Sequence, residues 1–217
     1  MGNSHSTPEG ASEENWHVFN FEKRLGFSDY DASEVELAML RNMKNSLITE
    51  FSYRNIESSL KLRYKETFRQ LVFEKFQAED GAIDGIKLAT LGLLLSRGSE
   101  REKMTAIWNI FDEAGKGELD RKQFGVMITT LFLASLGPTI EVSVNQDFTS
   151  NALSKWVEKL DRKIPDSVKE ILDFFLDQNP SLSISAFLTK LFEGPRGDLS
   201  NTFVIRRQLE RDEFDEL

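Results

Sequence analysis

The chain has 217 residues, of which 40% are apolar and 29% charged, with a net charge of −9 and no cysteine. The length allows one large domain or two small lobes, and the lack of cysteine excludes disulfides, thiolate zinc sites and cysteine nucleophiles. Such an acidic chain does not suit a phosphate backbone, so we expect no nucleic-acid partner. His5 and His17 are the only histidines, so we expect neither a catalytic triad nor enzymatic activity.

The N-terminus carries a lipidation pattern. Gly2 follows Met1, and Ser6 stands at the position that N-myristoylation requires. One myristoyl chain binds membranes weakly, with K about 10⁴ M⁻¹. Residues 1–22 contain no lysine or arginine that could add a second signal. No apolar run approaches the ~20 residues of a membrane-spanning helix, and no secretory signal is visible. We therefore expect a cytoplasmic protein that associates reversibly and peripherally with membrane.

Apolar residues recur at helical spacing after this arm. Ser33 and Glu36 form a capping-box pattern that predicts a helix start at Ser33, and a second helix is expected over about 60–76. Four later segments match the i, i+3, i+4, i+7 template, which predicts an all-α fold. The inward positions are Val35, Met39, Met43 and Leu47; Tyr64, Phe68, Leu71, Val72 and Phe76; Met104, Ile107, Trp108 and Phe111; Phe124, Met127, Ile128 and Leu131; Leu153, Trp156, Val157 and Leu160; and Val168, Ile171, Leu172 and Phe175.

Residues 111–124, FDEAGKGELDRKQF, fit a calcium-binding helix–loop–helix scaffold that has lost its ligands. With Asp112 at loop position 1, Gly117 takes the turn position, Leu119 the strand-pairing position and Asp120 position 9. Three positions that need oxygen ligands hold Ala114, Lys116 and Gln123. We therefore predict no physiological calcium binding, with Asp112 and Asp120 as the remaining weak candidate ligands.

Two further segments fit the same scaffold. In residues 73–88, Gly81 takes the turn, Ile83 the pairing position and Lys87 the closing position. Ile83 and Leu119 lie 36 residues apart, about the offset of paired hands, so we predict that their strands pair. Residues 174–187 resemble a more eroded hand, in which Asp177, Asn179 and Ile184 are recognisable and whose sister is expected near 145–148.

These motifs resemble the EF-hand superfamily over residues 68–132. The stretch 101–124, the opening MGNSHS and residues 25–28 are similar to neuronal-calcium-sensor and calcineurin-B-like proteins. Residues 97–103 show a weaker likeness to the N-terminal helical region of TLDc-domain proteins, which can be myristoylated too. The resemblance implies EF-hand-like helix–loop–helix pairs in one or two lobes.

The expected organisation has four parts separated by composition. They are a flexible arm over 1–15, an N-terminal lobe with a degenerate hand pair over 16–136, a C-terminal helical lobe over 145–200 with a possible second eroded pair, and a charged tail over 201–217. The stretch that begins Leu136-Gly137-Pro138 is the expected inter-lobe linker, because Gly-Pro stops a helix. Arg206, Arg207 and Arg211 belong to the tail, which we expect to be exposed.

We predict a non-enzymatic regulatory or adaptor protein, whose apolar groove holds an amphipathic helix of a partner protein. Trp108, Met127 and Leu131 are the candidate partner-binding residues, although the same side chains could fill the core of a lobe. The alternatives are a calcium-sensing switch, in which binding opens a helix pair, and a helical bundle whose polar turns only resemble hands. No cofactor is expected apart from the myristoyl group.

Overall fold

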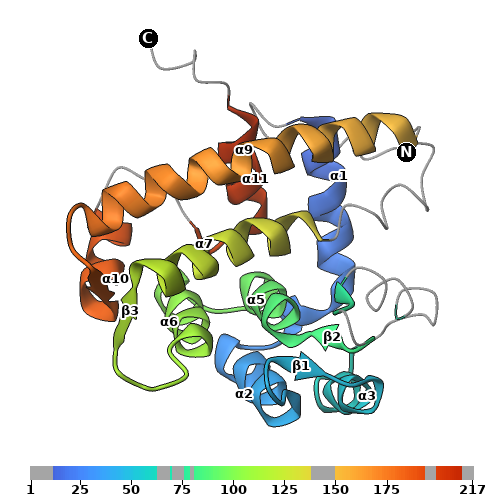
Figure 1. Cartoon of the computed structure of the whole chain (residues 1–217). Coiled ribbons are helices and arrows are strands. Elements are labelled where there is room, and N and C mark those ends of the chain that lie inside the picture. The colour runs from blue at the N-terminus through green and yellow to red at the C-terminus, as the bar shows by residue number, and fades with distance from the viewer. Residues whose placement is uncertain are drawn as a thin grey trace.

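The computed structural model describes residues 12–62, 69, 76–78, 81–137, 150–193 and 199–211. In this part the chain is mostly helical, and its named strands form two short two-stranded pairs (Figure 1). The predicted all-α, EF-hand-like class is confirmed. Four parts of the prediction lie outside the described residues. They are Gly2, most of the helix expected over 60–76, the expected linker after Gly137, and the tail after Arg211.

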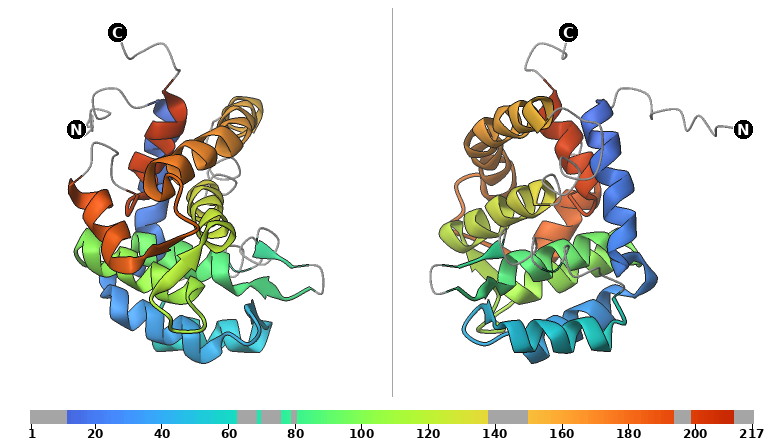
Figure 2. Two further views of the ribbon diagram at one scale, coloured as in Figure 1. Left: turned by 60° about the vertical axis from the view of Figure 1, so that its left-hand side comes forward. Right: turned by 90° about the vertical axis from the view of Figure 1, so that its right-hand side faces the viewer.

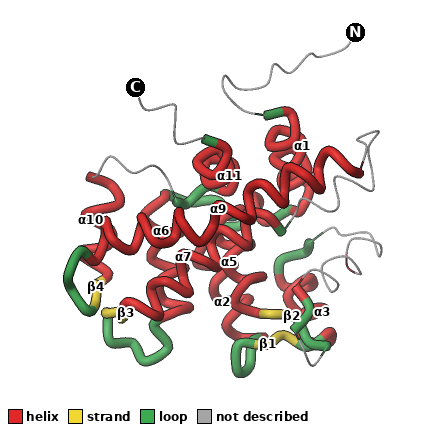
Figure 3. The backbone as a smooth tube through the Cα atoms, turned by 45° about the horizontal axis from the view of Figure 1, so that its top comes forward, coloured by secondary structure: helices red, strands yellow, loops and turns green. Residues whose placement is uncertain are grey.

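The first hand pair is built around strands β1 and β2. β1 (Leu47–Ile48) and β2 (Ile83–Asp84) run antiparallel, and Ile48 lies opposite Ile83. The helices of this pair are α2 (Ala32–Asn42), α3 (Glu50–Ser59) and α5 (Gly85–Leu95). Hand 1 consists of α2, β1 and α3, while β2 and α5 form the described part of hand 2. The tube in Figure 3 shows the two strands side by side next to α3.

The second hand pair is built in the same way around β3 and β4. β3 (Glu118–Asp120) and β4 (Ser181–Ser183) run antiparallel, with Leu119 opposite Leu182. The helices are α6 (Glu100–Phe111), α7 (Arg121–Leu136), α9 (Ser150–Leu176) and α10 (Ile184–Glu193). Hand 3 therefore consists of α6, β3 and α7, and hand 4 of α9, β4 and α10. The long α9 lies along α7.

This strand pairing corrects the predicted one. Ile83 pairs with Ile48, and Leu119 pairs with Leu182, so Ile83 and Leu119 do not pair with each other. All but Leu182 are fully buried. The sister of hand 4 is hand 3, and not a segment near 145–148. Its pairing residue is Leu182, since Ile184 is already the first residue of α10. The connection that begins at Gly137 consequently joins two hands of one pair.

Among the described residues, the first and last helices pack against each other beside the second pair. α1 (Glu13–Glu22) leads through two short 3-10 turns, η1 (Lys23–Leu25) and η2 (Phe27–Asp29), into α2. α11 (Thr202–Glu210) lies beside α1 and contacts α7 and α9 (Figure 2). The last three residues of the expected arm are therefore helical. Likewise, the described part of the expected exposed tail is a docked helix, because it carries buried side chains such as Ile205.

The start of α2 also differs from its prediction. Asp31, and not Ser33, is the N-cap: its carboxylate accepts from the Glu34 amide, and the Glu34 side chain accepts from the Asp31 amide at 2.9 Å. A second constraint fixes this start, because Arg97 Nε donates to the Asp31 carboxylate at 2.8 Å. Val35 and Met39 are buried as expected, whereas Met43 and Leu47 follow the helix end.

An aromatic cluster forms the centre of the second pair. Its four helices contribute Trp108, Phe124, Phe175 and Phe187, each at most 1% exposed. Trp108 and Phe187 stack with ring centroids 5.3 Å apart, and Phe124 meets Phe175 edge-on at 5.6 Å. Rings in such offset and edge arrangements add stability beyond that of their buried area. This cluster holds hands 3 and 4 together.

Candidate protein-interaction site and degenerate metal loops

All four exit helices begin with the same local construction. A buried aliphatic residue in the strand is followed at once by an N-cap side chain, whose oxygen accepts from the amide three residues later. The aliphatic residues are Ile48, Ile83, Leu119 and Leu182, and the caps are Thr49, Asp84, Asp120 and Ser183. The cap bonds measure 3.2, 3.0, 2.7 and 3.2 Å in that order. Each cap satisfies one of the free amides of a helix start.

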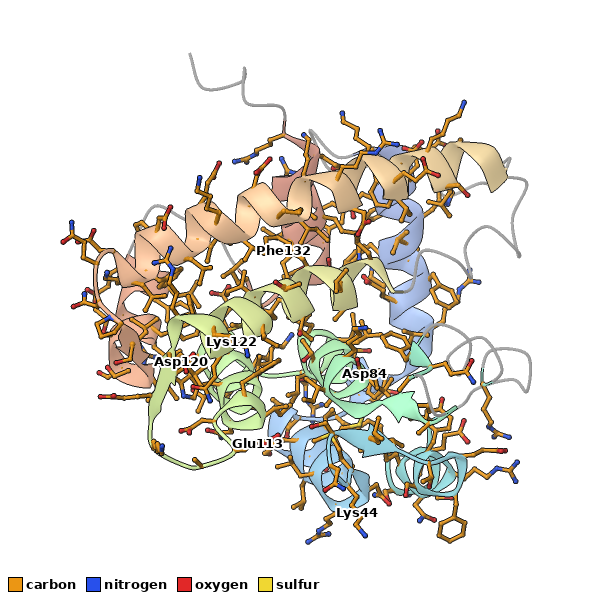
Figure 4. The ribbon with its side chains drawn as sticks, viewed as in Figure 1. Lys44, Asp84, Glu113, Asp120, Lys122 and Phe132 are labelled. Atoms are coloured by element: carbon orange, nitrogen blue, oxygen red, sulfur yellow. The ribbon has the colours of Figure 1, made fainter. Side chains whose placement is uncertain are left out.

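The loop of hand 3 closes on its own backbone. The Asp112 carboxylate accepts from the Lys116 amide at 2.9 Å and from the Gly117 amide at 2.6 Å. Gly115 and Gly117 have φ of 61° and 70°, in the left-handed region where glycine is favoured. Figure 4 shows Glu113 on this loop after α6. The side chain at loop position 1 thus holds the turn in place.

The closing end of the same loop is held by a capping box. The Gln123 side-chain oxygen accepts from the Asp120 amide at 3.1 Å, while the Asp120 carboxylate accepts from the Gln123 amide. Figure 4 places Asp120 at the start of α7. Both candidate ligands, Asp112 and Asp120, therefore have backbone partners. Within the described residues, no group of three or more His, Cys, Asp or Glu side chains could hold a metal ion. The expected lack of calcium binding stays a prediction.

The loops of hands 1 and 4 depart further from a metal-binding loop. In hand 1 the turn between α2 and β1 uses Asn45 and Ser46, with φ of 50° and 63°, and it carries no acidic side chain. In hand 4, Asp177 follows α9 with φ of 50°, only five residues before Leu182. In hand 3 the corresponding residues, Asp112 and Leu119, are seven apart. These loops keep the strand and the cap, but their turns are shorter than the turn of hand 3.

The three predicted partner-binding residues lie inside the core. Trp108, Met127 and Leu131 are at most 1% exposed, and Trp108 packs on the rings of Phe124 and Phe187. The structure brings Trp108 and the two α7 residues together in the second pair, but not at its surface. Their role in partner binding stays a prediction. In this conformation they stabilise the lobe.

A few large apolar side chains are exposed instead. Leu37 and Leu40 of α2 are 47% and 44% exposed, and their spacing puts them on one face of the helix. Phe51 at the start of α3 is 74% exposed, and Val126 of α7 is 50% exposed. Phe51 and the two leucines belong to hand 1, which the sequence patterns did not identify as a hand. These residues are the exposed apolar candidates for protein contact.

An ion pair and a capping hydrogen bond fix the junction between the hand pairs. The hydrogen bond and positive charge of Arg97 lower the pKa of Asp31 below its ordinary value. At the start of α6, Glu102 accepts from the Ser99 amide at 2.7 Å, and this cap lowers the pKa of the Glu102 carboxyl. Both carboxylates are thus favoured in their charged form. They anchor the short connection between α5 and α6.

A buried polar cluster at the meeting point of α1, α7 and α11 was not predicted. Arg206 is fully buried, and its Nη1 lies 2.6 Å from Oε1 of Glu22, which is 3% exposed. Asn15 Oδ1 accepts from Arg206 Nε at 2.8 Å, and the Ser135 carbonyl accepts from Nη1 at 2.8 Å. Thr202 donates to Glu22 at 2.8 Å. The sequence signal was available, because Ile205 and Leu209 flank Arg206 at helical spacing.

Paired helix–loop–helix units of this kind define an EF-hand-like, all-helical protein. The EH domain family model matches residues 61–160, and EH domains are EF-hand-like protein-interaction modules. The chain is therefore similar to the EH domain over this segment. No curated protein and no solved structure matches the sequence. The likeness to neuronal-calcium-sensor, calcineurin-B-like and TLDc-domain proteins stays a prediction.

The matched segment combines parts of both hand pairs. Residues 61–160 include β2 and α5 of hand 2, all of hand 3 and the beginning of α9. Strand pairing joins β2 to β1 and β3 to β4, so one strand of each pair belongs to hand 1 or hand 4 and lies outside the match. Among the described residues, no helix is long and apolar enough to cross a bilayer.

Proposed function

We propose that this protein is a non-enzymatic adaptor, which binds a partner protein through its helical hand pairs and reaches membranes through a myristoyl group on Gly2. The observation that carries the adaptor half is the EH domain match on an EF-hand-like fold, since EH domains mediate protein–protein contacts. The engaged carboxylates of Asp112 and Asp120 support a role that does not need calcium. We accordingly place the protein in the cytoplasm, at the membrane surface.

The membrane half rests on the N-terminal pattern and on the place where the folded body begins. Gly2 precedes the N-cap Ser12 by ten residues, which span at most about 36 Å when extended. An acyl group on this arm can therefore reach a bilayer while the body stays in solution. Because one myristoyl chain binds only marginally, lasting attachment requires the partner protein. Binding to partner and to membrane thus cooperate.

Fractionation of cells that express tagged wild-type protein or Gly2→Ala tests this proposal. Gly2→Ala removes the acylation site, so the membrane-associated fraction should fall to the level of a soluble control protein. Ser4→Ala is the matched control, because it changes the same arm and keeps both Gly2 and Ser6. Proximity labelling should recover the same partner with the two acylated proteins, and recover less of it with Gly2→Ala. Equal fractionation of wild type and Gly2→Ala would refute the lipid half.

A further inference from the structure

We propose that the second hand pair carries a binding surface for an amphipathic partner helix that contains an arginine, and that α11 occupies this surface as an internal ligand. The inference deepens the adaptor function proposed above and rests on it. The surface is formed by α7 and α9 and is bordered by α1. The partner chemistry follows from the way in which α11 is seated.

α11 has the anchor pattern of a helix bound in a groove. Thr202, Ile205, Arg206 and Leu209 are buried, at spacings i, i+3, i+4 and i+7 along one face. Helices that bind in grooves use this same set of positions for their anchors. α11 packs on α7, the exit helix of hand 3, and on α9, the entering helix of hand 4. It therefore spans the two hands of the pair, as a bound target helix would.

The polar anchor is specific for arginine. The two terminal nitrogens of Arg206 meet the two Glu22 oxygens at 2.6 and 3.0 Å, which is a bidentate contact. The remaining nitrogen donates to Asn15, and one terminal nitrogen also donates to the Ser135 carbonyl. A planar guanidinium satisfies all of these acceptors at once, whereas an ammonium group cannot make the bidentate contact. We call Asn15, Glu22 and the Ser135 carbonyl the arginine socket.

The docking of α11 is easier to reverse than that of α7. Its fully buried apolar side chains are Ile205 and Leu209, whereas α7 buries a longer row that includes Phe124, Phe132 and Leu131. A buried ion pair contributes little net stability, because desolvation offsets the attraction between the charges. Helices with few buried apolar contacts open with the smallest free energies. A partner helix with stronger apolar anchors can therefore replace α11.

Further hydrogen bonds join α11 to α1 and to α9. The Ser12 hydroxyl donates to Glu210, and Trp156 Nε1 donates to the same carboxylate at 2.9 Å. Asn15 Nδ2 donates to the Phe203 carbonyl at 3.2 Å. An incoming helix that offers an arginine keeps α1 in place, since the socket residues of α1 then retain a charged partner. A helix without arginine leaves Glu22 buried and unpaired, which is unfavourable.

The test uses a fluorescent peptide of residues 199–211 added to the full-length protein. Wild type should bind it weakly, because its own α11 competes at a high effective concentration. The Arg206→Ala protein should bind the wild-type peptide at least tenfold more tightly, while the matched control Arg207→Ala, which changes a partly exposed neighbour, should behave as wild type. A peptide carrying Arg206→Lys should lose at least tenfold in affinity. Equal binding by wild type and Arg206→Ala, or by both peptides, would overturn the proposal.

Hydrogen exchange on the wild-type protein keeps the test independent of how well Arg206→Ala folds. The amides of α11 should exchange at least ten times faster than those of α7, and excess unlabelled peptide should accelerate the exchange of the α11 amides in the protein. Protection of α11 equal to that of α7 would contradict a displaceable helix. If the peptide displaces α11 while no cellular partner is recovered, the surface stands and the adaptor function fails.

Discussion

Trp108 of α6 stacks on Phe187 of α10, with ring centroids 5.3 Å apart and ring planes 30° apart. The contact joins hand 3 to hand 4 inside the aromatic cluster, and Trp108 is 1% exposed. Trp108→Ala should therefore lower the free energy of unfolding by about 3–5 kcal/mol, as large aromatic truncations do. Chemical denaturation followed by circular dichroism measures the loss.

Trp108→Phe provides the matched control. The indole Nε1 is buried and has no hydrogen-bond partner among the described residues, so a phenyl ring loses volume but leaves no polar atom unsatisfied. We expect this change to cost less than half as much as Trp108→Ala. An unchanged stability of Trp108→Ala would place the ring at a surface and would favour the partner-binding role.

The buried pair of Arg206 and Glu22 predicts a non-additive double mutant. Glu22→Leu alone leaves a buried guanidinium without its counter-charge, which should cost about 3–5 kcal/mol. The double variant Glu22→Leu with Arg206→Met replaces both charges by apolar groups and should recover most of this loss. A thermodynamic cycle from urea melts measures the coupling. Strictly additive effects would show that the two side chains act independently.

Calcium should leave the stability of the wild-type protein unchanged. A 10 µM site would add about 2.7 kcal/mol at 1 mM calcium, which a thermal melt resolves easily. Restoring the ligands with Ala114→Asp, Lys116→Asp and Gln123→Glu should create a calcium-dependent rise in the melting temperature, because Gly117 and Leu119 already shape the loop. Stabilisation of wild type by calcium would favour the sensor alternative. No response of the triple variant would show that the loop cannot be restored by ligands alone.

The contact between Arg97 and Asp31 predicts a pH dependence. Arg97 lowers the folded-state pKa of Asp31 below its unfolded value. The stabilisation is therefore complete above the unfolded-state pKa, about 3.9, and is lost as the pH falls through the lower folded-state value. A carboxyl titration by NMR should show the Asp31 pKa rising in Arg97→Ala. The Glu102 pKa serves as the internal control, since hydrogen bonds with Ser99 are the main cause of its lowering.

Two glycines in helices should respond oppositely to alanine. A Cβ on Gly125 would meet Leu172 at 3.5 Å, an ordinary contact, so Gly125→Ala should raise stability by up to about 1 kcal/mol through helix propensity. A Cβ on Gly92 would lie 3.1 Å from Met39, Phe27 and Val35 at once. Gly92→Ala should therefore gain nothing or lose stability through overpacking. Thermal melts of the two variants compare them directly, and a Gly92→Ala protein more stable than Gly125→Ala would contradict the close packing of α2 on α5.

The helical class and hand 3 could be predicted because their signals are local. Periodic apolar residues and the spacing of Asp112, Gly117 and Leu119 determine a helix–loop–helix unit without reference to the rest of the chain. Which hands pair through their strands could not be predicted in the same way. The loop of hand 1 has no acidic residue, so ligand spacing could not reveal it, and Ile83 was matched with the nearest recognisable strand residue. The shared pattern of aliphatic residue, cap and apolar residue, as in Ile48, Thr49 and Tyr53, would have found it.

The apolar neighbours of Arg206 at helical spacing were a local signal for its burial, but the partners of Arg206 in the arginine socket could not be predicted from local patterns. Asn15 lies at the end of the polar segment assigned to the flexible arm, and Arg206 lies in the mixed-charge tail, so composition predicted solvent exposure for both. No pattern singled out Glu22. Their burial is a tertiary effect, because α1 and α11 are brought together over 184 residues of sequence. The candidate binding surface that depends on them was missed for the same reason.

The packing of α1 against α11 has a consequence for biosynthesis. α1 packs against residues 202–210, so it can dock fully only after those residues have been synthesised. Domains generally fold as units during synthesis, and here the unit that holds α1 is complete only once α11 is present. During this interval α1 lacks the helix that covers Asn15 and Glu22. Synthesis of α11 then brings the two helices together.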